Sequence, residues 1–129
     1  MTPPLGHILC IDDEEDILQV AKLALEAVGG FRVSLCRGSA EAVEQACILR
    51  PDLILLDVMM PEMDGPTTLE KLRDGGPCSA TPVIFMTAKA QPQEIQHFKE
   101  LGALGVITKP FDPMALPSEV RAIWESRGA

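Results

Sequence analysis

The chain has 129 residues, the length of one domain, and with 47% hydrophobic and 23% charged residues it has the composition of a folded protein. Its 11 basic and 19 acidic residues give a net charge of −8, which disfavours direct binding of this chain to nucleic acid or to anionic lipid. No apolar run approaches the roughly 20 residues of a membrane span, and the first six residues do not resemble a signal peptide. We therefore expect a cytoplasmic protein without membrane contact, folded as a single domain over residues 1–129 with a flexible start at residues 1–6.

The cysteines and histidines show no metal-binding spacing. There is no CxxC pair, and His7 and His97 stand far apart, so we expect no zinc site. We expect free thiols, mostly buried, at the four cysteines, which are Cys10, Cys36, Cys47 and Cys78.

Five short apolar runs alternate with five helical patterns. The runs are residues 8–11, 31–35, 53–56, 83–86 and 104–107. Strict alternation of strands and helices predicts a parallel sheet covered by helices on both faces. The third and fourth runs are continuously apolar, as central strands are, whereas the second alternates, as an edge strand does. A doubly wound sheet with strand order 2-1-3-4-5 satisfies both observations.

Apolar residues at helical spacing follow each run. In the first helix the buried face is predicted to be Ile17, Val20, Ala21, Ala24 and Val28, with Leu18 outside it and the end at Gly29-Gly30. Asp64 is the predicted N-cap of the third helix, which ends at Gly75-Gly76-Pro77. The other helices are indicated by Val43, Ala46, Cys47 and Arg50 before Pro51, by Leu69 and Leu72 in the third, by Ile95, Phe98 and Leu101 before Gly102, and by Leu116, Val120 and Ile123. Trp124 is predicted to pack partly exposed near the end of the chain, with an exposed partner patch as the alternative.

Polar side chains stand where the predicted strands end. Asp12 and Asp13 follow the first strand, Asp57 the third, Thr87 the fourth and Lys109 the fifth. Because ligands bind beyond the carboxyl ends of parallel strands, we expect these five side chains to converge there.

The acidic side chains have two interpretations. Asp12, Asp13 and the acids that follow them could simply favour a helix N-terminus. Asp57, however, follows four aliphatic residues, and two carboxylates about 4 Å apart repel by roughly 4 kcal/mol at an effective dielectric constant of 20. A Mg²⁺ ion on oxygen ligands offsets that repulsion most simply.

Thr87 and Lys109 extend this interpretation to a phosphorylated Asp57. A phosphoryl group brings three acceptor oxygens, for which Mg²⁺, the Lys109 ammonium and the Thr87 hydroxyl are partners. Ala88 is small enough to let a backbone N–H approach the same group. A carboxylate nucleophile that forms an aspartyl phosphate is known chemistry.

These residues resemble the receiver domain of two-component response regulators, over nearly the whole chain from about Ile8 to Arg127. The motifs that carry the resemblance are Asp12-Asp13, the segment 55–65 (LLDVMMPEMDG), Met86-Thr87-Ala88 and Lys109-Pro110-Phe111.

The resemblance implies a flavodoxin-like (βα)5 domain and a stand-alone regulator similar to chemotaxis regulators. Asp57 would accept a phosphoryl group from a histidine kinase or phosphotransfer protein and so change the binding of a downstream protein target or output domain. Met59, Thr87, Ala88 and Lys109 would bind the phosphoryl group. Mg²⁺ would be held by Asp13, Asp57 and the Met59 carbonyl, with Asp12 acting through water. The chain would catalyse only its own phosphorylation and slow dephosphorylation, and the Lys109–Pro110 bond would be cis.

The chain departs from the family pattern in two places. Val106 occupies the position where many receivers carry a Tyr or Phe that turns inward as Thr87 moves. Ala103-Leu104-Gly105 stands where many DNA-binding regulators carry acidic residues for dimerisation. We therefore expect phosphorylation to shift the fourth helix, fifth strand and fifth helix without rotation of an aromatic ring.

Three alternatives remain open. The first is a Mg²⁺-dependent phosphohydrolase with an aspartate nucleophile. The resemblance to such enzymes would require a second aspartate two residues after the nucleophile, as acid/base catalyst, and this chain has Met59 at that position. The chain could instead be a protein-binding module that is not phosphorylated, or a receiver cut from a longer regulator or hybrid kinase. The initial methionine mildly favours a stand-alone protein.

Overall fold

The computed structural model describes residues 4–38, 41–60, 63–74, 76 and 79–128. Within them, five strands alternate with five α-helices. The strands are β1 (His7–Asp12), β2 (Arg32–Arg37), β3 (Leu53–Asp57), β4 (Val83–Thr87) and β5 (Gly105–Thr108). The helices are α1 (Glu15–Leu23), α2 (Ala42–Leu49), α3 (Gly65–Leu72), α4 (Pro92–Glu100) and α5 (Leu116–Glu125). A π-helical turn (Ala24–Val28) continues α1, and a 3₁₀ turn (Ser126–Gly128) ends α5.

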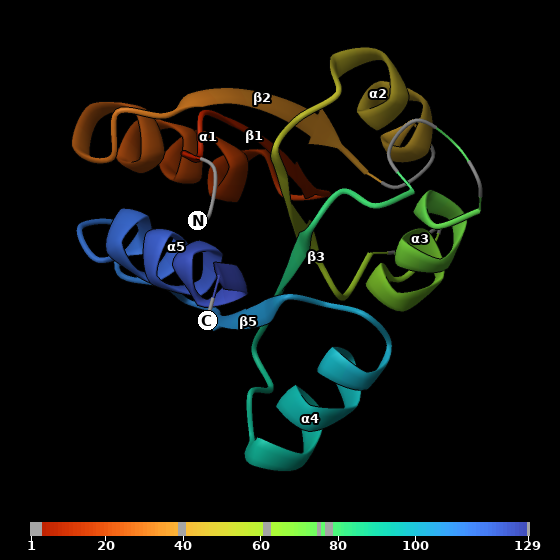
Figure 1. The fold of residues 1–129 in the computed structure, drawn as a ribbon. Coiled ribbons are helices and arrows are strands. Elements are labelled where there is room, and N and C mark those ends of the chain that lie inside the picture. Colours follow the sequence, from red (N-terminus) through yellow and green to blue (C-terminus); the bar gives the residue numbers. More distant parts are fainter. Residues whose placement is uncertain (1–3, 39–40, 61–62, 75, 77–78, 129) are drawn as a thin grey trace.

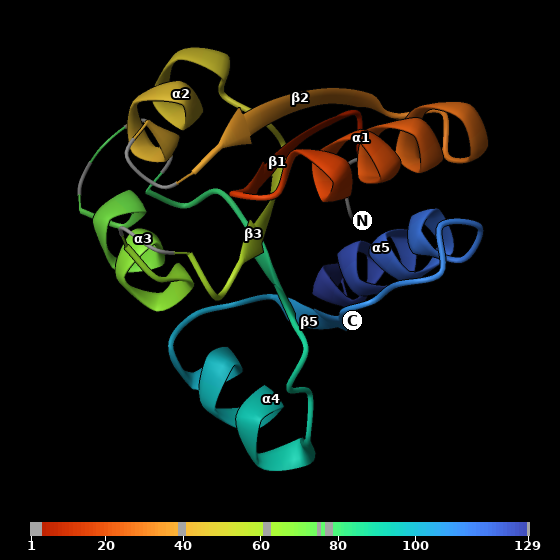
Figure 2. The ribbon, with the colours of Figure 1, turned by 180° about the vertical axis from the view of Figure 1, so that it is seen from behind.

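The five strands form one parallel sheet in the order β2-β1-β3-β4-β5, as the sequence predicts. Helices α1 and α5 lie together on one side of the sheet, and α2, α3 and α4 lie on the other (Figures 1 and 2). Two apolar clusters fill the spaces between these layers, one containing Leu18 and Val120 and the other Leu69 and Phe98. The fold is therefore doubly wound.

Burial along the strands follows the predicted positions. Every residue of β3 and β4 is buried, whereas β2, at the edge, is exposed at both ends and has only two buried residues, Val33 and Cys36, without a strict alternation. The strands begin and end within one or two residues of the predicted runs. Leu104 precedes β5 instead of opening it.

The buried face of α1 differs from the prediction. Leu18 is 1% exposed and packs in the core with Ala21 and Leu25, whereas Val20 is 41% exposed and Val28 is also on the surface. Ala21 and Ala24 are buried as predicted, so the observed stripe overlaps the predicted one and is rotated toward Leu18 and Leu25. A π-helical turn at Ala24–Val28, which the sequence pattern did not indicate, follows α1, and Leu25 within it is buried.

Three smaller expectations about the helices are corrected. Trp124 is buried on α5, with 5% of its surface exposed, so the exposed-patch alternative is wrong. Leu101 is largely exposed beyond the end of α4, and Phe98 is the buried anchor of that helix. Helix α3 ends at Leu72 with Arg73 as its C-cap, before the predicted Gly75-Gly76-Pro77 stop, of which Gly75 and Pro77 lie outside the described residues.

Cys10 and Cys36 are free thiols, as expected. Cys10 and Cys36 are buried and Cys47 is half-buried, whereas Cys78 lies outside the described residues. Burial raises the pKa of Cys10 to about 12, with the charge of Asp12 as a smaller cause, so this thiol is unreactive at neutral pH.

Residues 5–7 near the start of the chain are fixed to the rest of the domain by packing and hydrogen bonds. Leu5 packs against the core, and the backbone N–H groups of Gly6 and His7 donate to the Asp52 carboxylate. Residues 1–3 lie outside the described residues. No helix in the described part of the chain has the length and apolar character needed to cross a membrane.

Candidate functional site

The carboxyl ends of four strands bring the predicted side chains to one edge of the sheet. Asp12 ends β1, Asp57 ends β3, Thr87 ends β4, and Lys109 directly follows β5. In the sheet register Leu56 pairs with Ile11 of β1, and Asp57 pairs with Met86 of β4. Residues up to 97 positions apart in the sequence thus lie together because the strands are parallel and in register.

Lys109 joins two buried carboxylates. Its Nζ donates to Asp12 Oδ2 at 2.9 Å and to Asp57 Oδ1 at 3.2 Å. Asp12 has no exposed surface, and Asp57 is 3% exposed. The backbone N–H of Glu14 donates to the other Asp12 oxygen at 2.9 Å, and that of Met59 donates to Asp57 Oδ1 at 3.4 Å. Buried charges need such partners, and each carboxylate here has a cation and a backbone donor.

Burial and like charge shift the proton affinity of Asp57. Its removal from water, and next the charge of Asp12, raise the pKa of Asp57 from 3.8 to about 6, although Lys109 and the Met59 N–H work in the opposite direction. Burial of the Lys109 ammonium acts to lower its pKa, but the hydrogen bond and charge of Asp12, with those of Asp57, outweigh burial and raise it. Lys109 is therefore charged at neutral pH, and Asp57 is a partly desolvated carboxylate.

The three predicted acids offer oxygen atoms of the kind that bind a divalent cation. One carboxylate oxygen from each of Asp12, Asp13 and Asp57 lies within 4.8 Å of the others. Hard cations such as Mg²⁺ prefer oxygen ligands of this kind. The described residues at this edge therefore fit the magnesium ion that the sequence analysis expects.

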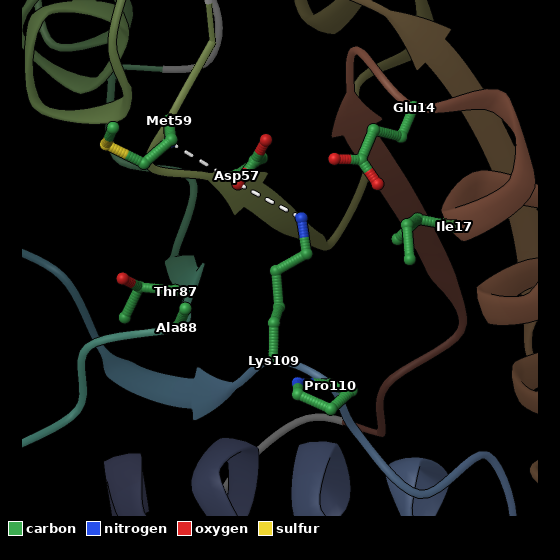
Figure 3. A pocket seen from close by; sticks show the side chains of 8 residues that line it. All are labelled: Glu14, Ile17, Asp57, Met59, Thr87, Ala88, Lys109 and Pro110. Carbon is green, nitrogen blue, oxygen red and sulfur yellow. Dashed lines mark hydrogen bonds and ion pairs between the residues drawn. The ribbon is translucent and has the colours of Figure 1, made fainter.

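Thr87 and Ala88 form the side of the site nearest β4. Thr87 is buried, and its Oγ1 accepts a hydrogen bond from the Lys89 backbone N–H at 3.1 Å, so the hydroxyl proton can be donated elsewhere. Both residues line a pocket of about 320 Å³ over Asp57 (Figure 3). That volume accommodates a phosphoryl group and part of its donor.

Met59 and Lys109 form two further sides of this pocket. Met59 follows β3 and is 76% exposed, and Lys109 precedes a cis peptide bond to Pro110, as the resemblance predicts. Gly65 fixes the loop that carries Met59, because a Cβ there would lie 2.9 Å from the Asp57 carbonyl oxygen and from Val58 Cα. Only glycine allows α3 to begin so close to the end of β3.

Three further lining residues, from the start of α1 and from the segment after β5, were not assigned to the site from the sequence. Glu14, Ile17 and Pro110 line the pocket together with the predicted residues. The sequence pattern places Glu14 in an acidic helix start and predicts a core position for Ile17. The position of Glu14 directly after Asp12-Asp13 was a signal that could have identified it.

The comparisons with known proteins follow this geometry. Residues 8–121 match the family described as the response regulator receiver domain. The chain belongs to that family. It is thus a receiver domain of two-component systems, which are signalling modules and not enzymes in the usual sense.

Curated relatives of this receiver domain include transcriptional regulators. It is 36% identical to the transcriptional regulatory protein CseB of Streptomyces coelicolor, over 91% of this chain and 48% of that protein. It is 37% identical to the alkaline phosphatase synthesis transcriptional regulatory protein PhoP of Bacillus subtilis, over 90% of this chain and 47% of that protein. The receiver domain spans about half the length of these relatives.

Solved structures show the same receiver fold in other settings. The chemotaxis response regulator CheY4 of Vibrio cholerae superposes with a TM-score of 0.84 at 29% identity, over 93% of this chain and 99% of that one. The receiver domain of a signal transduction histidine kinase from Syntrophus aciditrophicus gives a TM-score of 0.77 at 34% identity, over 94% and 91% of the two chains. The family therefore places similar receivers in chemotaxis regulators, transcriptional regulators and histidine kinases.

Proposed function

We propose that this receiver domain, a single domain over residues 1–129, is a phosphoacceptor. Asp57 accepts a phosphoryl group from a phosphohistidine of a histidine kinase or phosphotransfer protein. The observation that carries the proposal is the position of Asp57, a buried carboxylate at the floor of a pocket, joined to Lys109 and surrounded by Thr87 and Ala88.

In the transfer step an Asp57 oxygen forms a bond to phosphorus as the phosphorus–nitrogen bond of the donor breaks. The electron pair of that bond goes to the imidazole nitrogen of the donor histidine. Lys109 is near enough to Asp57 to neutralise one phosphoryl oxygen, and the Thr87 hydroxyl can donate to a second. The backbone N–H of Ala88 and that of Met59 supply further donors at the pocket wall. Catalysis is thus positioning and charge neutralisation by groups already in place.

Magnesium belongs to this proposal as the cofactor. Asp13, Asp57 and the Met59 carbonyl would hold the ion, with Asp12 acting through water. When bound, Mg²⁺ neutralises charge on the transferred group and relieves the repulsion among the three acids. Asp12 is also the stronger partner of Lys109, at 2.9 Å against 3.2 Å for Asp57, so it holds the ammonium next to the nucleophile.

The output of the proposed reaction is a change of the surface formed by α4, β5 and α5. Val106 of β5 lies opposite Phe85 in the sheet register and is half-buried, so no ring at position 106 turns inward. Thr87, in the same strand as Phe85, is the residue that a phosphoryl group would draw toward Asp57. Movement of the loop after β4 then reaches α4, and the altered surface binds a downstream protein or output domain.

Turnover of external phosphoesters is not part of this function. An aspartate-based hydrolase needs an acid next to the nucleophile to protonate the leaving group, and Met59 stands at the position two residues after Asp57. The receiver therefore catalyses its own phosphorylation and a slow loss of the phosphoryl group.

Intact-protein mass spectrometry tests the proposal. The protein is incubated with Mg²⁺ and phosphoramidate or acetyl phosphate, and we expect a mass gain of one phosphoryl group per chain. The gain should disappear without Mg²⁺ and in Asp57→Asn. A matched variant, Asp52→Asn, changes a carboxylate at the opposite end of the sheet and should retain the gain. No mass gain with either donor would overturn the proposal.

A further inference from the structure

Glu14 occupies the N-cap position of α1 without capping the helix. Its side chain makes no hydrogen bond to the first turn, whereas Asp64 caps α3 through its side chain. Instead the Glu14 backbone N–H donates to Asp12 Oδ1 at 2.9 Å. The backbone of Glu14 is thus fixed to the buried acid of the site, and its side chain is available for another role.

The Glu14 carboxylate faces the pocket over Asp57. Figure 3 shows it turned toward the Lys109 ammonium and Asp57, across the space that the eight lining residues surround. It is exposed and forms no hydrogen bond or ion pair with any other residue that the structure describes. Lys109 is already paired with Asp12 and Asp57. Of the charged side chains that line this pocket, Glu14 is therefore the one without a partner of opposite charge.

The pocket places Glu14 near the group that leaves. In phosphoryl transfer the attacking and leaving atoms lie roughly in line through phosphorus. Since Asp57 attacks from the floor, the leaving group departs toward the open side of the pocket. Apart from Asp57 and its partner Lys109, Glu14 is the one charged residue that lines this pocket.

We propose that Glu14 is a specificity-determining residue that favours phosphodonors with a protonated nitrogen leaving group over acyl phosphates. This inference rests on the proposed phosphoacceptor function and names the donor class for the same site. A carboxylate at the open side attracts a protonated nitrogen and repels the carboxylate that an acyl phosphate releases.

Glu14 gains or loses no proton or bond in the reaction with either phosphodonor. With phosphoramidate, which carries its proton on nitrogen, the Asp57 carboxylate bonds to phosphorus, the phosphorus–nitrogen bond breaks, and its electron pair leaves on neutral ammonia. With acetyl phosphate, the phosphorus–oxygen bond breaks and its electron pair leaves on acetate. At the transition state the first leaving group is still partly positive, whereas the second is already partly negative. Glu14 acts on that difference in charge through its own charge alone.

The test compares initial phosphorylation rates with the two donors at low ionic strength and saturating Mg²⁺. In Glu14→Gln we expect the rate with acetyl phosphate to rise relative to the rate with phosphoramidate, by roughly three- to tenfold for loss of one nearby charge. The difference should shrink in high salt because the carboxylate is exposed. Asp16→Asn removes the same charge from an exposed position on α1 outside the pocket lining, and should leave the ratio of the two rates unchanged. The magnesium affinity of each variant, measured by calorimetry, supplies a readout independent of donor chemistry.

The outcomes separate this inference from the function on which it rests. An unchanged ratio in Glu14→Gln, with the wild-type protein phosphorylated, overturns the role of Glu14 and leaves the phosphoacceptor function standing. A fall in magnesium affinity in Glu14→Gln also overturns it, because the residue would then act on the metal. A wild-type protein that neither donor phosphorylates overturns both.

Discussion

The ionised carboxylate of Asp57 destabilises the folded protein, because it is buried and lies near the charge of Asp12. A pKa of about 6 in the folded protein, against 3.8 as the ordinary value, means that the folded state holds a proton between these pH values and the unfolded state does not. Stability without metal therefore falls as the pH rises from about 4 to 6, and above that range the full cost remains. That pKa difference corresponds to roughly 3 kcal/mol.

We therefore expect Asp57→Asn to be more stable than the wild-type protein in the presence of EDTA. At about pH 7 the gain should be on the order of 2–3 kcal/mol, because the amide carries no charge and can still accept from Lys109. The gain should shrink as the pH falls below about 6. Urea unfolding at several pH values measures it, with the exposed Asp16→Asn as the control. A variant that is less stable than the wild type at about pH 7 would contradict this account of Asp57.

At the scale of elements, α3 is the helix whose start is tied to the site. Asp64 accepts a hydrogen bond from the Thr67 N–H at 2.9 Å, and Gly65 lies against the backbone that follows Asp57. The Thr67 side chain and, next, that N–H lower the pKa of Asp64. The cap and the close approach together hold the loop that carries Met59 to the end of β3.

Loss of this cap should reduce stability without abolishing phosphorylation. We expect Asp64→Ala to lower the free energy of unfolding by about 1 kcal/mol, the usual effect of removing an N-cap side chain. Asp64→Asn keeps an oxygen acceptor and should recover most of the loss. Thermal or urea unfolding measures both variants. Equal stability of Asp64→Ala and the wild type would show that the loop is held by Gly65 and the packing of α3 alone.

Helix α4 is attached to the sheet more sparsely than the other helices. Phe98 is its buried residue, and its ring meets Phe85 of β4 edge-to-face at 5.0 Å between ring centres. The other helices each bury two or more residues. A helix with one aromatic anchor, next to the loop that follows Thr87, can shift at low cost, which suits the output that we propose for α4, β5 and α5.

At the scale of the whole molecule, activation should change one face and leave the others. We expect beryllofluoride with Mg²⁺, a phosphoryl mimic, to move backbone amide NMR signals in α4, β5 and α5 as well as at the site. Two new hydrogen bonds to a charged group, from Thr87 and a backbone N–H, supply about 3–6 kcal/mol for this change.

The control for this experiment is Thr87→Ala. It retains Asp57 and Lys109, so it should bind the mimic while the signals of α4 move less. Signals on that face that stay unchanged in the wild-type protein would contradict coupling through Thr87.

The sequence was sufficient to predict the sheet and the convergence of Asp12, Asp57, Thr87 and Lys109 at one edge of it. Continuous apolar runs at residues 53–56 and 83–86 indicate central strands, and parallel strands bring their carboxyl ends to one edge. Asp12, Asp57, Thr87 and Lys109 follow such strands, so their convergence depends on strand order and not on packing details. For the same reason the misassigned positions of α1, Leu18, Val20 and Val28, did not disturb the prediction of the site.

Tertiary structure alone decided which residues of α1 are buried and what the helix contributes to the pocket. The patterns that include Leu18 or Val20 are both helical, and only packing against the sheet, with the π-helical turn, selects Leu18. The same packing brings Glu14 to the pocket, where its charge faces the open side. Strand order follows from local composition and chain connectivity, whereas the rotation of a helix depends on contacts with residues far away in the chain.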